Sequence, residues 1–168
     1  MARTRIEPYE EAGQALSIIA SPGALLVAGR GKPNPMTIGW GQLGPVWGKP
    51  VFAALVRPSR HTHKLLLEHG EFTVNVPGDA LADALELCGT KSGRDVDKIA
   101  AAGLSLVSGE TVAVPSLAGA RYVYECRVVH RTEMIPANAD AAVIGSFYPR
   151  GDWHAVFHGI VLAAFRED

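Results

Sequence analysis

Cysteine is scarce in this sequence of 168 residues: only Cys88 and Cys126 occur, and no CxxC pair exists. That excludes a disulfide framework and a structural zinc site of the usual spacing. An excess of charge of one sign is also lacking, because 16 Lys and Arg residues stand against 17 Asp and Glu residues. The balance speaks against binding to nucleic acid or to an acidic membrane, so any anion site must be local.

Long apolar runs are missing as well. Residues 15–28 form the longest apolar region, but Ser21, Pro22 and Gly23 interrupt it and it is too short to span a bilayer. Acidic residues stand near the N-terminus, where a signal peptide needs an apolar core. We expect a cytoplasmic protein with no membrane partner.

The composition is that of a folded domain. Hydrophobic residues make up 48% and charged residues 20%, and a chain of this length buries about two-thirds of its surface on folding. We expect a single domain over residues 1–168. The 18 glycines and 11 prolines are spread along the chain as turn residues, which favours many short elements and a β-rich fold.

Local patterns predict both element types. Helices are expected at residues 5–20, 60–69, 80–87 and 96–102, and strands at 24–30, 36–41, 50–56, 71–76, 111–114, 120–130, 141–148 and 154–165. The first three strands follow one another without crossover helices, so the sheet should be antiparallel. The expected architecture is a six- or seven-stranded antiparallel barrel with two or three helices packed outside it.

Residues 39–44 match the dinucleotide-binding pattern GxGxxG. That motif requires a helix to begin within it, so that the helix N-terminus meets the pyrophosphate. Pro45, Gly48 and Pro50 follow at once and prevent a helix. We interpret the segment as a glycine-rich strand and hairpin.

Residues 57–64 contain basic and hydroxyl side chains and no acid. We expect Ser59 to cap the helix that follows, beside Arg57, Arg60 and Thr62. A helix N-terminus with unpaired N–H groups and flanking arginines suits a phosphate. An ordinary capped surface helix with solvated basic residues explains the stretch equally well.

Two further segments allow similar pairs of interpretations. Residues 92–98 have small residues and two cations, with Asp95 as the expected N-cap, but Asp95 and Asp97 would oppose an anion. Residues 34–40 combine a glycine, a hydroxyl, a thioether and an indole that could line a flat aromatic ligand. A capped helix start and a core strand are the respective alternatives.

Five linked segments resemble the flavin reductase-like family, particularly its flavoredoxin branch. They are Met36-Thr37-Ile38-Gly39-Trp40, Gly48-Lys49-Pro50, Arg57-Pro58-Ser59-Arg60, residues 70–77 and residues 88–98. Their order and spacing match from about residue 20 to residue 130. The resemblance implies an FMN-binding split β-barrel, usually a homodimer with flavin near the subunit interface.

The resemblance also implies which residues meet the cofactor. Along the isoalloxazine ring we expect Met36, Thr37, Ile38 and Trp40. At the phosphate or ribityl chain we expect Arg57, Ser59, Arg60 and Thr62, with His61 where relatives often carry an aromatic residue. Asn75 should lie near the flavin, and Cys88, Ser92 and Lys98 belong to a loop that closes over it.

The implied activity is that of an NAD(P)H-dependent flavin reductase. NADH or NADPH would pass a hydride to flavin N5, while the protein supplies binding, orientation and electrostatics and no catalytic side chain. A downstream electron-acceptor protein or monooxygenase would receive the electrons. The alternatives are a flavin-binding electron-transfer protein without intrinsic NAD(P)H activity and a split barrel that holds heme or another planar ligand.

The histidines and Cys88 allow weaker hypotheses. His61 and His63 are two residues apart on the expected helix and cannot chelate one metal ion, so we expect no metal site. His154 and His158 share one face of the last expected strand, where they would be partly exposed or would line a pocket. Cys88 is either a buried structural cysteine or a reactive thiol near a helix end.

Overall fold

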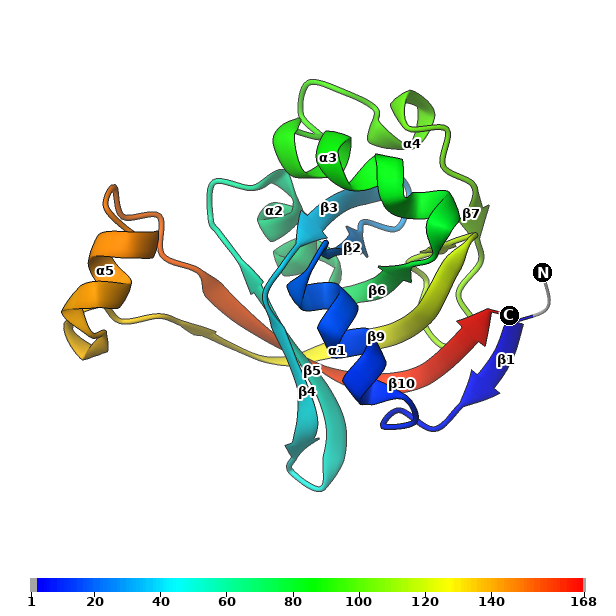
Figure 1. Cartoon of the computed structure of the whole chain (residues 1–168), viewed down its shortest axis with the longest axis horizontal. Coiled ribbons are helices and arrows are strands. Elements are labelled where there is room, and N and C mark those ends of the chain that lie inside the picture. The colour runs from blue at the N-terminus through cyan, green and yellow to red at the C-terminus, as the bar shows by residue number, and fades with distance from the viewer. Residues whose placement is uncertain (1–2, 168) are drawn as a thin grey trace.

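Eight antiparallel strands form the main sheet of the computed structural model, which describes residues 3–167 (Figure 1). The path through the sheet is β3-β2-β6-β9-β10-β5-β4, and β1 pairs with β10. The predicted mainly β, antiparallel architecture is confirmed, but over residues 3–167 the main sheet has eight strands and not six or seven, and there are five α-helices and not two or three. Within residues 3–167, no helix is both long enough and apolar enough to cross a membrane.

The strands have the following bounds: β1 Arg3–Ile6, β2 Ala24–Ala28, β3 Asn34–Ile38, β4 Gly41–Val46, β5 Lys49–Val56, β6 Glu71–Pro77, β9 Ala120–Glu133 and β10 Ala155–Glu167. A separate two-stranded sheet joins β7 (Leu106–Val107) to β8 (Ser116–Leu117). The helices are α1 (Ala12–Ala20), α2 (His61–His69), α3 (Ala82–Thr90), α4 (Lys98–Ala101) and α5 (Ala141–Phe147), with 3₁₀ turns at Asp79–Leu81 and Pro136–Asn138.

The sheet has a core on each face. Strand β2 is buried along its whole length because Leu26 packs into a core with Phe52, Phe72 and α1, while Leu25 packs into a second core under α3. Helix α1 contacts both β4 and β6, which are not neighbours in the sheet, so the sheet curls around this helix. A continuous apolar strand is expected where both faces are covered.

Three helices pack against the edge strand β3. The two basic segments of the sequence, residues 57–64 and 92–98, also meet there. Helices α2, α3 and α4 all contact β3, and among the described strands β3 pairs with β2 alone (Figure 1). The edge of β3 that has no strand partner and the N-terminal ends of α2 and α4 therefore border a common cavity.

The N-terminal prediction is wrong in its boundary. The helix expected at residues 5–20 begins only at Ala12, and Arg3–Ile6 is a strand. Pairing with β10 fixes that strand, and Arg3 forms an ion pair of 2.9 Å with Glu167 near the other end of the chain. This partner is 164 residues away in sequence, so no local pattern indicates it.

The strand predicted at residues 111–114 is absent from the sheets. Two carboxylates satisfy its backbone instead: Glu125 accepts from the N–H groups of Glu110 and Thr111, and Glu71 accepts from that of Ala113. Glu125 is fully buried and also accepts the Thr111 hydroxyl. Side-chain acceptors therefore replace a strand ladder in this segment.

The strand predicted at residues 141–148 is helix α5. Asp140 caps its first turn by accepting from the N–H of Ala142 at 2.8 Å. A short apolar run can form either a strand or a helix. Here the hydrogen bond from Ala142 N to the Asp140 side chain stabilises the start of a helix. Residues 134–154, which we call the arm, carry α5 away from the body between β9 and β10 (Figure 1).

Candidate functional site

A cavity of about 290 Å³ opens along the end of β3. Residues 36–40 form one side of it, and its remaining walls are Leu55, Arg57, Arg60, Gly89 and His154. We call it the strand cavity. The four residues predicted along a flat ring, Met36, Thr37, Ile38 and Trp40, all line it, and Trp40 is 40% exposed.

A second cavity, of about 190 Å³, lies at the start of α2. We call it the cationic cavity because Arg60, Arg94 and Lys98 line it, together with Asn34, Met36, Ser59, His61, Thr62 and residues 90–93. Met36 and Arg60 belong to both cavities, so the two spaces meet at this pair. One molecule with a planar part and an anionic part would occupy both.

Backbone carbonyls hold the two central cations in place. Arg60 donates to Gly89 O at 2.8 Å, and its Nε lies 3.4 Å from the sulfur of Met36. Lys98 is only 4% exposed and donates to Pro35 O and Cys88 O at 3.0 and 2.9 Å. Burial lowers the pKa of Lys98, and an anion beside it would favour the charged ammonium.

The cap at the start of α2 differs from the prediction. The N-cap is Arg60, and the Ser59 side chain donates to the Asp152 carboxylate at 2.6 Å. Asp152 also accepts from the Ser59 backbone N–H at 3.2 Å. An acidic residue of the arm therefore contacts residues 57–64, a segment that contains no acidic residue. Ser59 still lines the cationic cavity, but its hydroxyl proton is engaged.

Arg57 binds the arm. Its guanidinium donates to Asp152 O at 3.0 Å and to Phe147 O at 2.9 Å, and it lies over the Tyr148 ring at 5.0 Å. It lines the strand cavity but not the cationic one. In this structure Arg57 and Ser59 therefore fasten the arm against the body, while Arg60 stands between the two cavities.

The loop after α3 fits tightly around α2. A Cβ at Gly93 would lie 1.8 Å from Oδ1 of Asn34 and 3.0 Å from the His61 ring. Asn34 is buried and donates to the Thr62 hydroxyl at 2.9 Å, which holds β3 against α2. The glycine lets the loop with Ser92 approach this pair. The cap of α4 is Asp97, which accepts from Ile99 N and Ala100 N, and not Asp95 as predicted.

His61 contributes an unpaired nitrogen to this region. Its Nδ1 is buried and has no hydrogen-bond partner among the described residues. Burial, followed by the charge of Arg94, lowers the pKa of His61. The imidazole is therefore neutral near pH 7 and can donate or accept a hydrogen bond in the cationic cavity.

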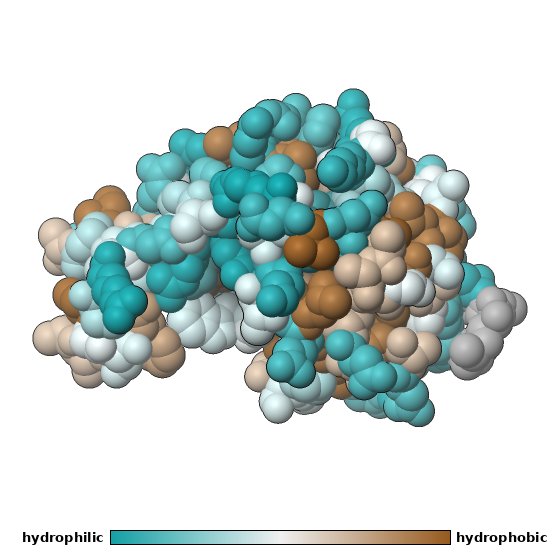
Figure 2. Space-filling model, turned by 90° about the horizontal axis from the view of Figure 1, so that it is seen from above, coloured by the Kyte–Doolittle hydropathy of each residue, from teal (hydrophilic) through white to brown (hydrophobic). Residues whose placement is uncertain are grey.

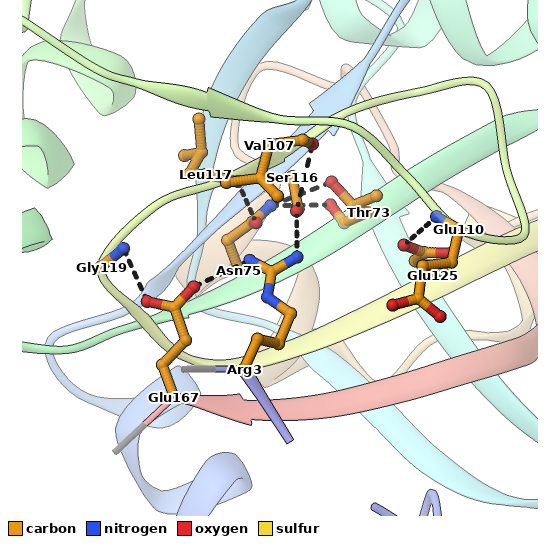
Figure 3. Close-up of polar contacts among 10 residues, drawn as sticks. All are labelled: Arg3, Thr73, Asn75, Val107, Glu110, Ser116, Leu117, Gly119, Glu125 and Glu167. Carbon is orange, nitrogen blue, oxygen red and sulfur yellow. Dashed lines mark hydrogen bonds and ion pairs between the residues drawn. The ribbon is translucent and has the colours of Figure 1, made fainter. Parts of the chain in front are cut away.

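Asn75 is placed away from both cavities. Its Oδ1 accepts from Leu117 N at 2.8 Å, and its Nδ2 donates to the Thr73 hydroxyl at 3.0 Å (Figure 3). Nδ2 also donates to Leu25 O at 3.1 Å. The side chain is fully buried. Its polar groups are used within the protein, so its role here is to join β6, β2 and β8.

The structure also decides between the alternatives for Cys88 and for the two histidines near the C-terminus. Cys88 is buried and burial raises the pKa of its thiol, which favours the structural alternative. His154 precedes β10, is 8% exposed and lines the strand cavity. His158 lies on β10 beside His130 and Trp47 instead, with ring centroids 5.3 and 6.2 Å away.

Several residues around these cavities were not predicted as site residues. They include Leu55, Gly89, Arg94 and Asp152. The basic cluster at residues 92–98 did indicate Arg94, because two cations follow two small residues there. Asp152 lies 93 positions from its partner Ser59 and leaves no local pattern.

Comparison with known proteins places most of the chain in one family. Residues 16–167 match the model of the flavin reductase like domain. An uncharacterized protein of Archaeoglobus fulgidus is 38% identical over 110 residues, which are 65% of this chain and 61% of that protein. The chain thus spans about three-fifths of the length of this relative.

Solved structures give the same fold. A flavoredoxin from Methanosarcina acetivorans is 28% identical with a TM-score of 0.70, over 88% of this chain and 69% of that one. An FMN-binding protein from Thermus thermophilus, with bound 1-cyclohex-2-enone, is 27% identical with a TM-score of 0.68, over 86% and 70% of the two chains. A Streptomyces globisporus NADH:FAD oxidoreductase, 21% identical with a TM-score of 0.67 over 96% and 86% of the two chains, shares the fold.

Proposed function

Because the chain belongs to the flavin reductase-like family, we propose that it binds FMN in the two joined cavities and reduces it with NADH or NADPH. The observation that carries the proposal is the union of the strand cavity and the cationic cavity at Met36 and Arg60. A planar ring fits the first and a phosphate fits the second. FMN combines these two parts in one molecule.

The residues present suit this cofactor. Arg60, Arg94 and Lys98 supply charged donors, and the first turn of α2 supplies N–H groups that lack intrahelical partners. The unpaired His61 nitrogen adds a further polar group beside them. Residues 36–40 would hold the ring, with the Trp40 indole and the Met36 thioether as apolar contacts.

When bound, FMN would supply the redox chemistry, which is the acceptance of a hydride from a reduced nicotinamide. The chain's own part is binding and orientation. Arg60 contacts the Met36 sulfur and Gly89 O, and so links the strand cavity to the cationic cavity. Arg57 hydrogen-bonds to the arm at Phe147 and Asp152 and so holds the arm beside the strand cavity. Neighbours named as flavoredoxin and as FMN-binding protein support the cofactor assignment.

Anaerobic reduction tests the activity. We expect NADH or NADPH to remove the visible absorbance band of oxidised FMN bound to the protein within seconds. A band that persists with both NADH and NADPH, but disappears with dithionite, would contradict reductase activity and favour a flavin-binding electron carrier. A protein that takes up no FMN would contradict the whole proposal.

We also propose that two copies of the chain associate. Exposed apolar side chains support this, since Trp47 at the β4–β5 turn is 61% exposed and Ile135, Val143 and Phe147 are exposed on the arm. Figure 2 shows apolar residues, in brown, at the end of the molecule that the arm forms. Light scattering after size-exclusion chromatography should give twice the chain mass of 17.8 kDa. A mass of one chain at micromolar concentration would contradict the dimer.

A further inference from the structure

The arm contributes a carboxylate to the start of α2, beside the cationic cavity. Asp152 Oδ2 accepts from the Ser59 hydroxyl at 2.6 Å, and Asp152 Oδ1 accepts from the Ser59 backbone N–H at 3.2 Å. Ser59 lines the cationic cavity, whereas Asp152 does not. Both hydrogen-bond donors of Ser59 are therefore bound to an anionic side chain of the arm, and they cannot serve a second anion at the same time.

The charge of this carboxylate is not balanced by a cation. Asp152 has no ion-pair partner among residues 3–167, and its carboxylate oxygens accept from neutral groups of Ser59. On the other side of Ser59, Arg94 lines the cationic cavity and donates to the Ser59 carbonyl at 2.9 Å. Ser59 thus separates the negative charge of the arm from a cation of the proposed phosphate site, so Asp152 would repel a phosphate bound there.

The contact between Asp152 and Ser59 is one that can open. It belongs to the return turn of the arm, residues 148–152. Ser59 and Asp152 are both exposed, so water competes for their hydrogen bonds. Asp152 also has a φ of 56°, a left-handed conformation that costs energy in a residue other than glycine. Exposure and backbone strain both reduce the free energy needed to release the carboxylate.

We propose that Asp152 is an internal competitor of the FMN phosphate. While its carboxylate is bound to Ser59, the phosphate site lacks two donors and has a negative charge beside it. A phosphate that takes these donors releases the return turn. The inference rests on the proposed function and concerns the regulation of the same site.

The competition has a consequence for the flavin. Coupling between two binding events is reciprocal, so FMN binding and attachment of the return turn weaken each other by the same factor. The arm therefore lowers the affinity for FMN, which favours a flavin that exchanges with solution over one that is held permanently.

Flavin titration of an Asp152 variant tests the competition. Asp152→Gly removes the carboxylate and suits the left-handed backbone, so FMN affinity should rise about 3- to 10-fold, as expected for an exposed charge-assisted contact. Riboflavin has no phosphate, so its affinity should change by less than about twofold. The matched control is Asp140→Asn, which removes the same charge from another exposed position of the arm while asparagine still caps α5. It should leave FMN affinity unchanged.

Limited proteolysis measures release of the return turn. Arg150 is an exposed residue of this turn, and trypsin cleaves after it only when the turn opens locally. Saturating FMN should accelerate this cleavage about 3- to 10-fold in the unmodified protein, the same factor as in the titration, and should have no such effect in Asp152→Gly. Mass spectrometry of the fragments identifies the cut, which Arg150→Ala abolishes.

The possible results separate this inference from the proposed function. An FMN affinity of Asp152→Gly that is equal to or below that of the unmodified protein would overturn the inference. An equal gain for riboflavin, or cleavage at Arg150 that FMN slows or leaves unchanged, would also overturn it. In each of these cases FMN still binds, so the proposed function stands. If neither protein binds FMN, the proposed function is refuted and the inference with it.

Discussion

Replacement of Arg60 by alanine is expected to weaken FMN binding about 100-fold, because hydrogen bonds to a charged group contribute about 1.5–3 kcal/mol each. Arg60 is the cation shared by both cavities, and it holds Met36 and Gly89 in place. Quenching of FMN fluorescence during a titration measures the change. Arg60→Lys keeps the charge but loses the planar guanidinium, so its FMN affinity should lie between that of Arg60→Ala and that of the unmodified protein.

The matched control for this change is Arg150→Ala. Arg150 is exposed on the arm and lines neither cavity. It should bind FMN as the unmodified protein does. If Arg60→Ala and Arg150→Ala bind FMN equally well, the phosphate is not held in the cationic cavity.

Replacement of Asn75 by alanine is expected to lower the free energy of unfolding by about 3 kcal/mol, because it leaves the buried N–H of Leu117 unpaired and removes the amide's hydrogen bonds to Leu25 O and the Thr73 hydroxyl. For a chain of this length the melting temperature should fall by about 10 °C. FMN affinity of the folded protein should stay within about twofold of the original, since Asn75 lines neither cavity. Urea unfolding followed by circular dichroism gives the first quantity.

Asn138→Ala provides the comparison for the stability measurement. Asn138 is exposed on the arm, so its replacement should change stability by less than about 0.5 kcal/mol. Asn75→Ala with unchanged stability but greatly reduced FMN affinity would return Asn75 to the flavin site that the family resemblance implied.

The sequence predicted those parts of the fold that local patterns determine. Strand β2 was visible as a continuous apolar run, α2 by its leucines and the following glycine, and β6 by alternation. Residue types indicated Arg60 as a candidate for the anion site, and the family resemblance added residues 36–40 as candidates for contact with a flat ring. The structure places both in the walls of adjoining cavities.

What escaped prediction depends on partners distant in sequence. Asp152 takes the Ser59 hydroxyl, which moves the cap of α2 to Arg60, and Glu125 replaces a strand ladder at residues 110–111. Tyr148 and His154 meet only because the arm is a helix with a return loop and not the strand that was predicted. Each of these contacts is determined by tertiary structure, so propensity and spacing along the chain do not indicate it.

Comparison of FMN with riboflavin tests the central claim most directly, because riboflavin has the same ring and ribityl chain but no phosphate. Titration of the purified protein with each flavin, followed by fluorescence quenching, gives the two dissociation constants. We expect FMN to bind at micromolar concentration or below and riboflavin at least about 100-fold more weakly, since the cationic cavity contributes through charge-assisted hydrogen bonds. Equal affinities for the two flavins, or no binding of either, would contradict the assignment of the joined cavities to FMN.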